Sequence, residues 1–223
     1  ILHFDIGREK SIKALEAAMT GDKQLFLTSQ KDENILIPTP EDYYTIGTVV
    51  KVKQMLKIQG DAVRVLVEGQ YRAELKGIAT DEPYIMAEIE EVEVIPADPQ
   101  EVEVQALMRS VLYAFDEYME LNPGIKDEAY ELISSIEEPD IFADTVAMQL
   151  EVKIASKQEA LEALDVKKRL EIVNRLILEE NQILAMERDI SERVQEAVKQ
   201  NQKEYILREQ MKVIQDELGY GEE

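Results

Sequence analysis

Residues 1–97 contain stretches in which apolar and polar side chains alternate. The longest runs from Ile46 to Ile58, where three lysines occupy the positions between apolar side chains. A turn signal follows at Gln59-Gly60-Asp61, and Val63 to Val67 resume the alternation. A period of two is typical of a half-buried β-strand, and two such runs around a short turn predict a β-hairpin. On the first strand we expect one apolar face made of Ile46, Val50, Val52, Leu56 and Ile58.

A different period precedes this hairpin. Between Lys10 and Met19 the apolar side chains recur every three or four residues, which predicts an amphipathic helix. Gly21 follows at a position where glycine commonly ends a helix. The short apolar run from Leu25 to Thr28 then predicts another strand.

The run from Tyr84 to Ile95 also alternates, but its rhythm changes phase at Glu90-Glu91. A β-bulge at this doublet would keep both apolar sets on one face of the sheet. Alternatively, the strand twists out of the sheet after Ile89. The sequence predicts a strand here and does not distinguish a β-bulge from a strand that twists out of the sheet.

The period changes to a helical one after Asp98. This aspartate is predicted to cap a helix, with Pro99 in the first turn and Glu101 closing a capping box. Ser156 to Glu159 form a second predicted capping box, and Asp165 is expected to cap the last helix. Apolar periodicity predicts the intervening helices at residues 104–119, 126–136 and 141–150.

The segment from Asp165 to Leu218 contains neither glycine nor proline, which predicts one very long helix. A narrow apolar stripe follows it, fades between Lys199 and Glu204, and then returns. Nothing else in the sequence offers this second part a partner, so we expect the stripe to pack on another copy or on a following domain. The alternative is a frayed helix end. The stripe consists of Leu176, Ile183, Ile190, Val194, Leu207, Met211, Ile214 and Leu218.

Composition narrows the classes of partner. The hydrophobic fraction of 45% is sufficient for a folded core despite a net charge of -22. Such a charge argues against binding of nucleic acid and of anionic membrane surfaces, since both require a basic face. It is compatible with attraction of basic or unfolded polypeptides, or with solubility alone. No apolar run approaches the ~18 residues of a membrane span, and we expect a cytoplasmic protein.

Catalytic motifs are missing from the sequence. There is no phosphate-binding loop and no Gly-x-Ser-x-Gly motif, and the protein has no cysteine and a single histidine, His3. We therefore expect no catalytic residues, no metal site and no bound cofactor. An acidic cluster could be interpreted as the carboxylates of a metal-dependent hydrolase, but strand periodicity favours a solvated edge that resists aggregation. This cluster comprises Glu88, Glu90, Glu91 and Glu93.

Three residues are candidates for contact with a polypeptide. Tyr43 and Tyr44 follow a proline-containing loop, where they could be exposed aromatics that grip a peptide or the start of the hairpin core. Met55 lies on the hairpin and is included because we expect it to be exposed. The neighbouring Ile35-Leu36-Ile37 has the same two interpretations as the tyrosines.

Three sequence strings resemble one protein family. The run from Gln202 to Lys212, followed by Glu217-Leu218-Gly219, resembles the segment that leads into the ATPase module of Lon proteases. The hairpin residues Gly47-Thr48-Val49 and Val63 to Ala73 resemble the amino-terminal domain of the same family. Gly7 to Glu16 resembles that domain's first helix, although His3 stands where proline is usual. The strings occur in the family's order across nearly the whole sequence.

The resemblance implies an α+β fold. Residues 1–97 would form a β-rich, partly closed barrel-like lobe, residues 98–164 an α-helical bundle, and residues 165–223 a long protruding helix that leads toward an ATPase module.

The resemblance also implies a function. This region would be a non-catalytic domain for substrate recognition and oligomer assembly in an ATP-dependent serine protease that degrades misfolded, damaged and regulatory proteins. Its partners would be unfolded or damaged proteins and further copies of itself, typically in a hexamer. ATP and magnesium would be bound by the full-length protein, outside this region. The alternative is a pure scaffold that assembles the ring without touching substrate.

Overall fold

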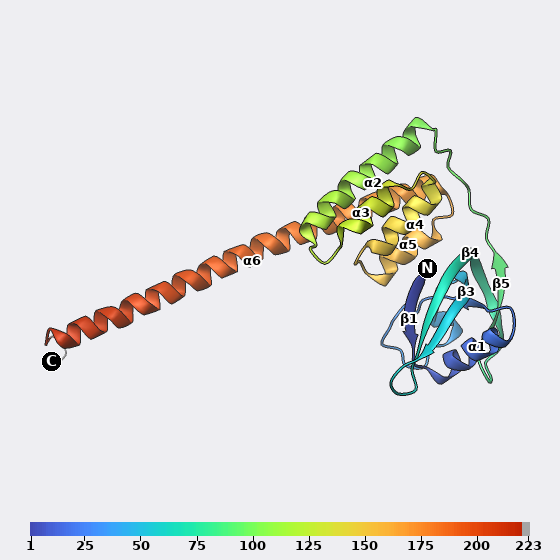
Figure 1. Ribbon diagram of the computed structural model, residues 1–223, viewed down its shortest axis with the longest axis horizontal. Helices are drawn as coiled ribbons and strands as arrows, with labels where there is room; N and C mark the ends of the chain where they lie inside the picture. Colours follow the sequence, from blue (N-terminus) through green and yellow to red (C-terminus); the bar gives the residue numbers. More distant parts are fainter. Residues whose placement is uncertain (220–223) are drawn as a thin grey trace.

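An antiparallel sheet of five strands forms the first lobe of the computed structural model, which describes residues 1–219 (Figure 1). Its central strand is β4, which pairs with β3 on one side. On the other side, the first part of β4 pairs with β1 and its last part with β5. The elements of this lobe are β1 (Leu2–Ile6), α1 (Glu9–Thr20), β2 (Gln24–Leu27), a short 3-10 helix (Pro40–Asp42), β3 (Ile46–Lys57), β4 (Val63–Thr80) and β5 (Met86–Glu91).

The predicted hairpin of β3 and β4 is confirmed, but the predicted apolar face of β3 is partly wrong. Register shifts lie between Val49 and Val50 and between Val52 and Gln54. The second shift leaves Lys53 as an extra residue in β3, which reverses the alternation after it, so Leu56 is 50% exposed. Helix α1 covers the apolar face of the sheet, where Leu15 is completely buried. Burial of one such side chain contributes about 1.5–3 kcal/mol.

Strand β5 is shorter than the sequence predicts. It ends at Glu91, and the residues around Glu90 pair with β4 without a shift, so the bulge predicted at the Glu90-Glu91 doublet is wrong. The register shifts lie further along and place the extra residues in β4, one of them between Leu75 and Gly77. The chain leaves the sheet after the Val92 amide has donated a hydrogen bond to the Arg72 carbonyl. This departure is close to the alternative of a strand that twists away.

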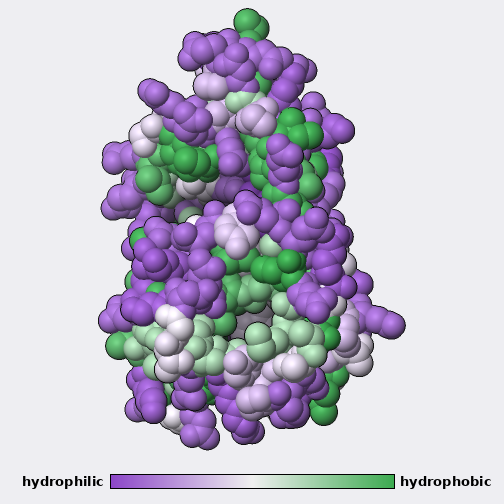
Figure 2. All heavy atoms as spheres, turned by 90° about the vertical axis from the view of Figure 1, so that its right-hand side faces the viewer, coloured by the Kyte–Doolittle hydropathy of each residue, from purple (hydrophilic) through white to green (hydrophobic). Residues whose placement is uncertain are grey.

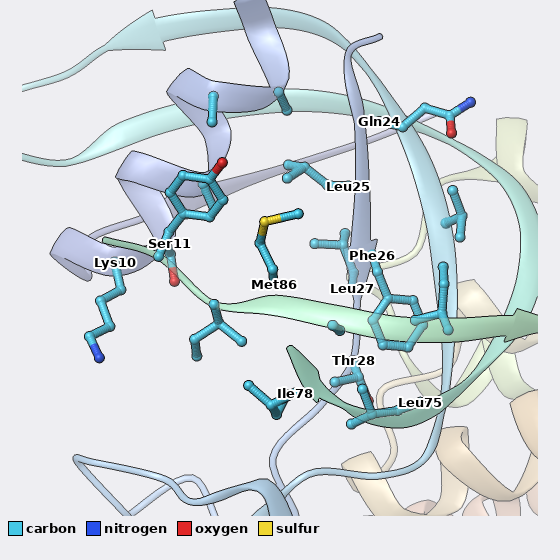
Figure 3. A pocket seen from close by; sticks show the side chains of 18 of the residues that line it. Lys10, Ser11, Gln24, Leu25, Phe26, Leu27, Thr28, Leu75, Ile78 and Met86 are labelled. Atoms are coloured by element: carbon cyan, nitrogen blue, oxygen red, sulfur yellow. The ribbon is translucent and has the colours of Figure 1, made fainter. Parts of the chain in front are cut away.

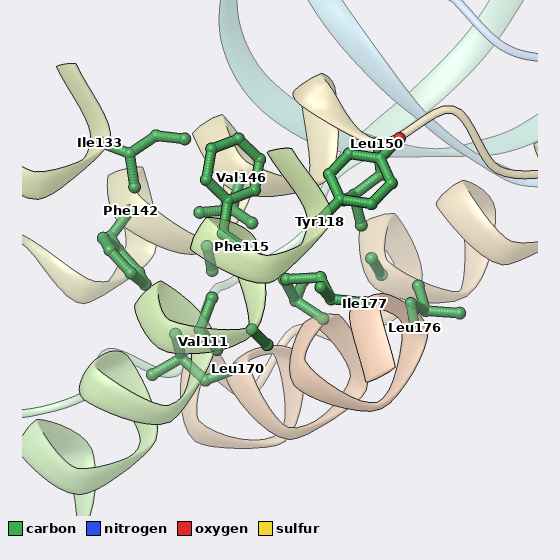
Figure 4. Close-up of a cluster of buried hydrophobic side chains, with 14 of the residues drawn as sticks. Val111, Phe115, Tyr118, Ile133, Phe142, Val146, Leu150, Leu170, Leu176 and Ile177 are labelled. Atoms are coloured by element: carbon green, nitrogen blue, oxygen red, sulfur yellow. The ribbon is translucent and has the colours of Figure 1, made fainter. Parts of the chain in front are cut away.

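The second lobe packs helices around one apolar core (Figure 4). Phe115 and Tyr118 lie side by side with ring centroids 6.0 Å apart, and the Tyr118 hydroxyl accepts a hydrogen bond from the Glu151 amide. A buried tyrosine requires such a partner for its hydroxyl. The helices are α2 (Val102–Leu121), α3 (Asp127–Ser134), α4 (Pro139–Gln149), α5 (Ile154–Glu162) and α6 (Val166–Glu217).

One of the three predicted helix caps is confirmed. Asp165 accepts hydrogen bonds from the amides of Lys167 and Lys168 and begins α6. Asp98 is not a cap, because its carboxylate accepts from the Gln100 amide in a separate turn and α2 begins only at Val102. The predicted box at Ser156 is also wrong. Helix α5 already begins at Ile154, with the Lys153 carbonyl closing its first turn.

Helix α6 is one continuous helix of 52 residues. At 1.5 Å per residue it is about 78 Å long. Its first part belongs to the bundle, and the buried Asn181 donates a hydrogen bond to the Ala114 carbonyl of α2. Beyond that contact the helix extends away from both lobes (Figure 1). The α+β fold with a β-rich lobe, a helical bundle and a long protruding helix is thereby confirmed. Residues 220–223, which the predicted arm includes, lie outside the described residues.

Candidate functional site

An apolar hollow of about 550 Å³ lies on the β-rich lobe, between α1, β2 and β5. Its lining includes Leu25, Phe26 and Leu27 of β2 and Met86 and Ala87 of β5. In Figure 3 the Met86 side chain points from β5 toward Leu25. Seen from outside, apolar side chains gather around a depression in this lobe and polar residues frame them (Figure 2). Clefts of this size and character are typical of ligand-binding sites.

Two polar groups at the hollow, Lys10 and Thr28, are engaged within the protein. The Lys10 ammonium lies 2.9 Å from the Asp81 carboxylate and 3.1 Å from that of Glu82. These hydrogen-bonded carboxylates raise the pKa of Lys10, which keeps the amine charged. The Thr28 hydroxyl donates to the Tyr44 carbonyl at 2.7 Å. Groups committed in this way can shape a binding surface but are not poised for acid-base or nucleophilic chemistry.

Burial also affects a tyrosine at the hollow. Desolvation raises the pKa of the Tyr43 hydroxyl above its ordinary value, because the interior disfavours the phenolate. The side chain is half-buried and lines the hollow, and its backbone forms an isolated bridge with Gln30. This tyrosine therefore presents a neutral aromatic surface to the hollow.

The three sequence-derived candidates do not come together. Tyr43 lines the hollow, whereas Tyr44 is half-buried outside it and donates its amide to the Ser29 carbonyl. Met55 packs against the core of the sheet from β3, so its expected exposure is wrong. Of the three, only Tyr43 belongs to the hollow, and the roles of all three in substrate contact stay predictions.

Sequence reasoning missed most of the hollow. Its wall on β5 includes Met86, 50% exposed, and Ile89, 36% exposed. The apolar alternation of Ile85, Ala87 and Ile89 was visible in the sequence and could have indicated this wall. The sequence pattern does not tell which face of this strand remains uncovered in the folded protein. In the loop before Tyr43, Leu36 and Ile37 are 84% and 88% exposed, so the exposed interpretation applies to these two residues.

The apolar stripe on α6 is the second exposed surface. Leu176 is the exception, because it is 5% exposed and packs in the core of the bundle. Its expected place in an intermolecular stripe is therefore wrong, since the side chain already has its partners within the chain. The other seven side chains are 47–66% exposed: Ile183, Ile190, Val194, Leu207, Met211, Ile214 and Leu218.

A family model matches most of the sequence. The substrate-binding domain of the ATP-dependent protease La (LON) is matched by residues 1–179. The chain belongs to the Lon family. None of its helices within residues 1–219 is long and apolar enough to cross a membrane.

Curated Lon proteases match all or nearly all of the chain. It is 46% identical over 227 residues to a Lon protease of Clostridioides difficile (strain 630), covering 100% of this chain and 29% of that protein. It is 43% identical over 219 residues to Lon protease 1 of Bacillus subtilis (strain 168), covering 98% of this chain and 28% of that protein. The chain thus spans less than a third of the length of these relatives.

Solved Lon domains share the fold. The N-terminal domain of a Mycobacterium avium complex Lon protease superposes with a TM-score of 0.62 at 21% identity, covering 79% of this chain and 89% of that domain. A Lon N-terminal domain protein from Xanthomonas campestris gives a TM-score of 0.53 at 10% identity, with 76% and 85% covered. At these identities the likeness concerns the fold alone.

Proposed function

We propose that this chain recognises substrates for an ATP-dependent Lon protease. The observation that carries the proposal is the solvent-open apolar hollow on a chain of the LON substrate-binding family. Folded proteins bury most of their apolar side chains, whereas unfolded and damaged ones expose them. The hollow would hold such exposed segments, with Tyr43 and Met86 at its wall, and would carry out no chemistry itself.

The same proposal gives the arm a role in assembly. Apolar stretches that follow one side of an otherwise polar helix are the usual sign of a packing partner. We infer that α6 associates with other copies of the chain, in a cytoplasmic ring that is a hexamer in the full-length protein. The β-rich lobes would then stand above the ring and deliver captured chain to an ATPase module, which would bind ATP and magnesium.

The first experiment compares two states of one labelled protein. We would measure its binding to this chain by fluorescence anisotropy, once folded and once permanently unfolded, at two salt concentrations. Apolar capture predicts selective binding of the unfolded form that persists at high salt. Binding that disappears at high salt would instead show that the unfolded protein is held by electrostatic attraction to the net charge of -22.

The alternative function is a pure scaffold, which the exposed stripe on α6 favours over any catalytic role. It predicts that neither labelled form binds, while removal of the residues after Lys199 abolishes self-association. Binding of unfolded protein by this chain would exclude the pure scaffold. Equally good delivery of substrate without the residues after Lys199 would show that the arm has no part in the mechanism.

A further inference from the structure

The helical lobe carries a second hollow of about 620 Å³, which we call the bundle hollow. Its lining comes from the residues just before α3, from α3, from the end of α4 and the connection that follows it, and from α5. Leu150 belongs to the core of the bundle, and Ile125, Ala129 and Val152 pack against that core, so these walls are held in place. A hollow of this size with fixed apolar walls is typical of a small-molecule site.

One lysine at the bundle hollow has no carboxylate beside it. The Lys157 ammonium donates to the Met148 carbonyl at 3.4 Å, and within residues 1–219 no carboxylate oxygen lies within 4.0 Å of it. An ammonium can donate three hydrogen bonds, and the Met148 carbonyl accepts one of them. Two donors of Lys157 therefore remain for a ligand.

The pKa of Lys157 reflects the same shortage of nearby negative charge. Although the side chain reaches solvent, desolvation lowers its pKa, and the attraction of Glu151 offsets only part of this effect. Lys10, Lys13 and Lys76 differ, because hydrogen-bonded carboxylates raise their pKa values. An ammonium that has lost water without gaining an anion is stabilised by a carboxylate that reaches it.

The other charged groups of the bundle hollow already have local roles. The Glu151 carboxylate accepts a hydrogen bond from the Asn122 amide nitrogen at 3.3 Å. Glu128 lies in the first turn of α3, where the helix dipole favours a negative charge, and Lys126 is the residue before that turn. The bundle hollow is thus no general anion-binding surface. What distinguishes it is one desolvated ammonium, that of Lys157, beside apolar walls.

We propose that the bundle hollow binds a small apolar monocarboxylic acid, whose carboxylate pairs with the ammonium of Lys157. The hydrocarbon part would lie against Leu132 and Met148, which are 53% and 46% exposed. Covering these side chains removes apolar surface from water, which favours binding. This inference adds a ligand other than a polypeptide, and it does not depend on the proposed function.

The test uses octanoate, octanamide and butyrate as probes of the whole chain in isothermal titration calorimetry. We expect octanoate to bind about fivefold more tightly than octanamide, because only the acid offers a charge to Lys157. Butyrate should bind at least about tenfold more weakly than octanoate, because it lacks four methylene groups. Equal binding of octanoate and octanamide, or no binding of octanoate, would overturn the proposal.

Variants of the protein locate the carboxylate. Lys157→Met should weaken octanoate binding about fivefold and leave octanamide binding unchanged, which also shows that the variant is folded. Lys168→Met makes the same change in net charge at an exposed position of α6 and should have no effect. Lys157→Arg keeps the charge and should restore most of the affinity. Equal losses in the two methionine variants would assign the effect to overall charge and overturn the contact.

Two further results would assign the ligand elsewhere. Octanoate binding that survives Lys157→Met but is lost in Met86→Asp would place the acid in the hollow of the β-rich lobe and overturn the proposal. Displacement of octanoate by lower concentrations of a peptide with a free C-terminal leucine would show that the bundle hollow takes chain ends, which also overturns it. Failure of the chain to bind unfolded protein would contradict the proposed function and leave this inference standing.

Discussion

Arg72 of β4 and Asp144 of α4 join the two lobes through a bidentate ion pair. The guanidinium nitrogens lie 3.0 and 2.7 Å from the two carboxylate oxygens, and the Arg72 Nε also donates to the Leu161 carbonyl at 2.9 Å. Asp144 additionally accepts from Arg169, a completely buried residue that also pairs with Asp140. One carboxylate therefore serves two arginines from different lobes, and the hydrogen bond from Gln158 to the Ile46 carbonyl adds a second contact between the lobes.

Substitution of Asp144 should weaken the whole fold. Asp144→Asn removes the carboxylate charge that pairs with the guanidinium groups of Arg72 and Arg169. Removal of one partner of a buried ion pair is strongly destabilising. Because the Asp144 side chain is 44% exposed, we expect a loss of about 2 kcal/mol in the free energy of unfolding. Urea denaturation would measure it. Asp189→Asn, which breaks an exposed pair with Arg193 on α6, should change stability by less than about 0.5 kcal/mol.

Truncation of two leucines of α6 should have different effects: one variant should lose stability and the other self-association. Leu176→Ala creates a cavity in the bundle core and should cost about 2–5 kcal/mol of unfolding free energy. Leu207→Ala removes a side chain that is 53% exposed and should change stability by less than about 0.5 kcal/mol. In sedimentation measurements, however, Leu207→Ala should weaken self-association. Unchanged self-association would contradict the role proposed for the stripe.

A charge introduced into the hollow should weaken capture without unfolding the protein. Met86→Asp places a carboxylate at a position that is 50% exposed, and we expect binding of unfolded protein to weaken about tenfold, because apolar segments would meet an unpaired charge. Met148→Asp makes the same change at a 46% exposed site on α4 and should bind normally. Anisotropy titrations of both variants would check the prediction, and equal losses would refute it.

Gly47 has a specific steric role beside the hollow. A β-carbon at this position would lie 2.3 Å from the Leu27 carbonyl oxygen and 2.7 Å from the Phe26 ring. Gly47→Ala should therefore push β2 away from β3, lower stability by about 1–3 kcal/mol and weaken binding in the hollow. Thermal and urea unfolding would measure the loss. Gly7→Ala, where nothing lies within 4 Å of the added carbon, is the neutral control.

Alkaline pH should affect Tyr43. Burial raises its pKa above the ordinary value of 10.0 in the folded chain, so the folded state holds this proton more tightly than the unfolded one. The resulting stability is complete below pH 10 and is lost as pH rises through the folded-state pKa. Tyr43→Phe should remove this part of the alkaline dependence in urea midpoints. An identical pH profile for the two proteins would contradict the assignment.

Local signals in the sequence were sufficient for the helices and the hairpin. Apolar period, the turn at Gly60 and the carboxylate of Asp165 act over a few residues, and each was confirmed. Signals that depend on competition between neighbours failed. Asp98 had a local turn available in place of the helix cap, and the phase of β3 depended on a bulge that only pairing with β4 produces.

By itself, the sequence determined the α+β order of elements, the length of α6 and the absence of catalytic motifs, because these depend on residue type and short-range periodicity. Only the tertiary structure decided which apolar side chains remain exposed. Leu176 and Leu207 occupy the same helix, yet the core of the bundle covers the first and not the second. The hollow arises likewise, because β5 is distant in the sequence from α1 and β2, and their uncovered faces meet only after the sheet has curled.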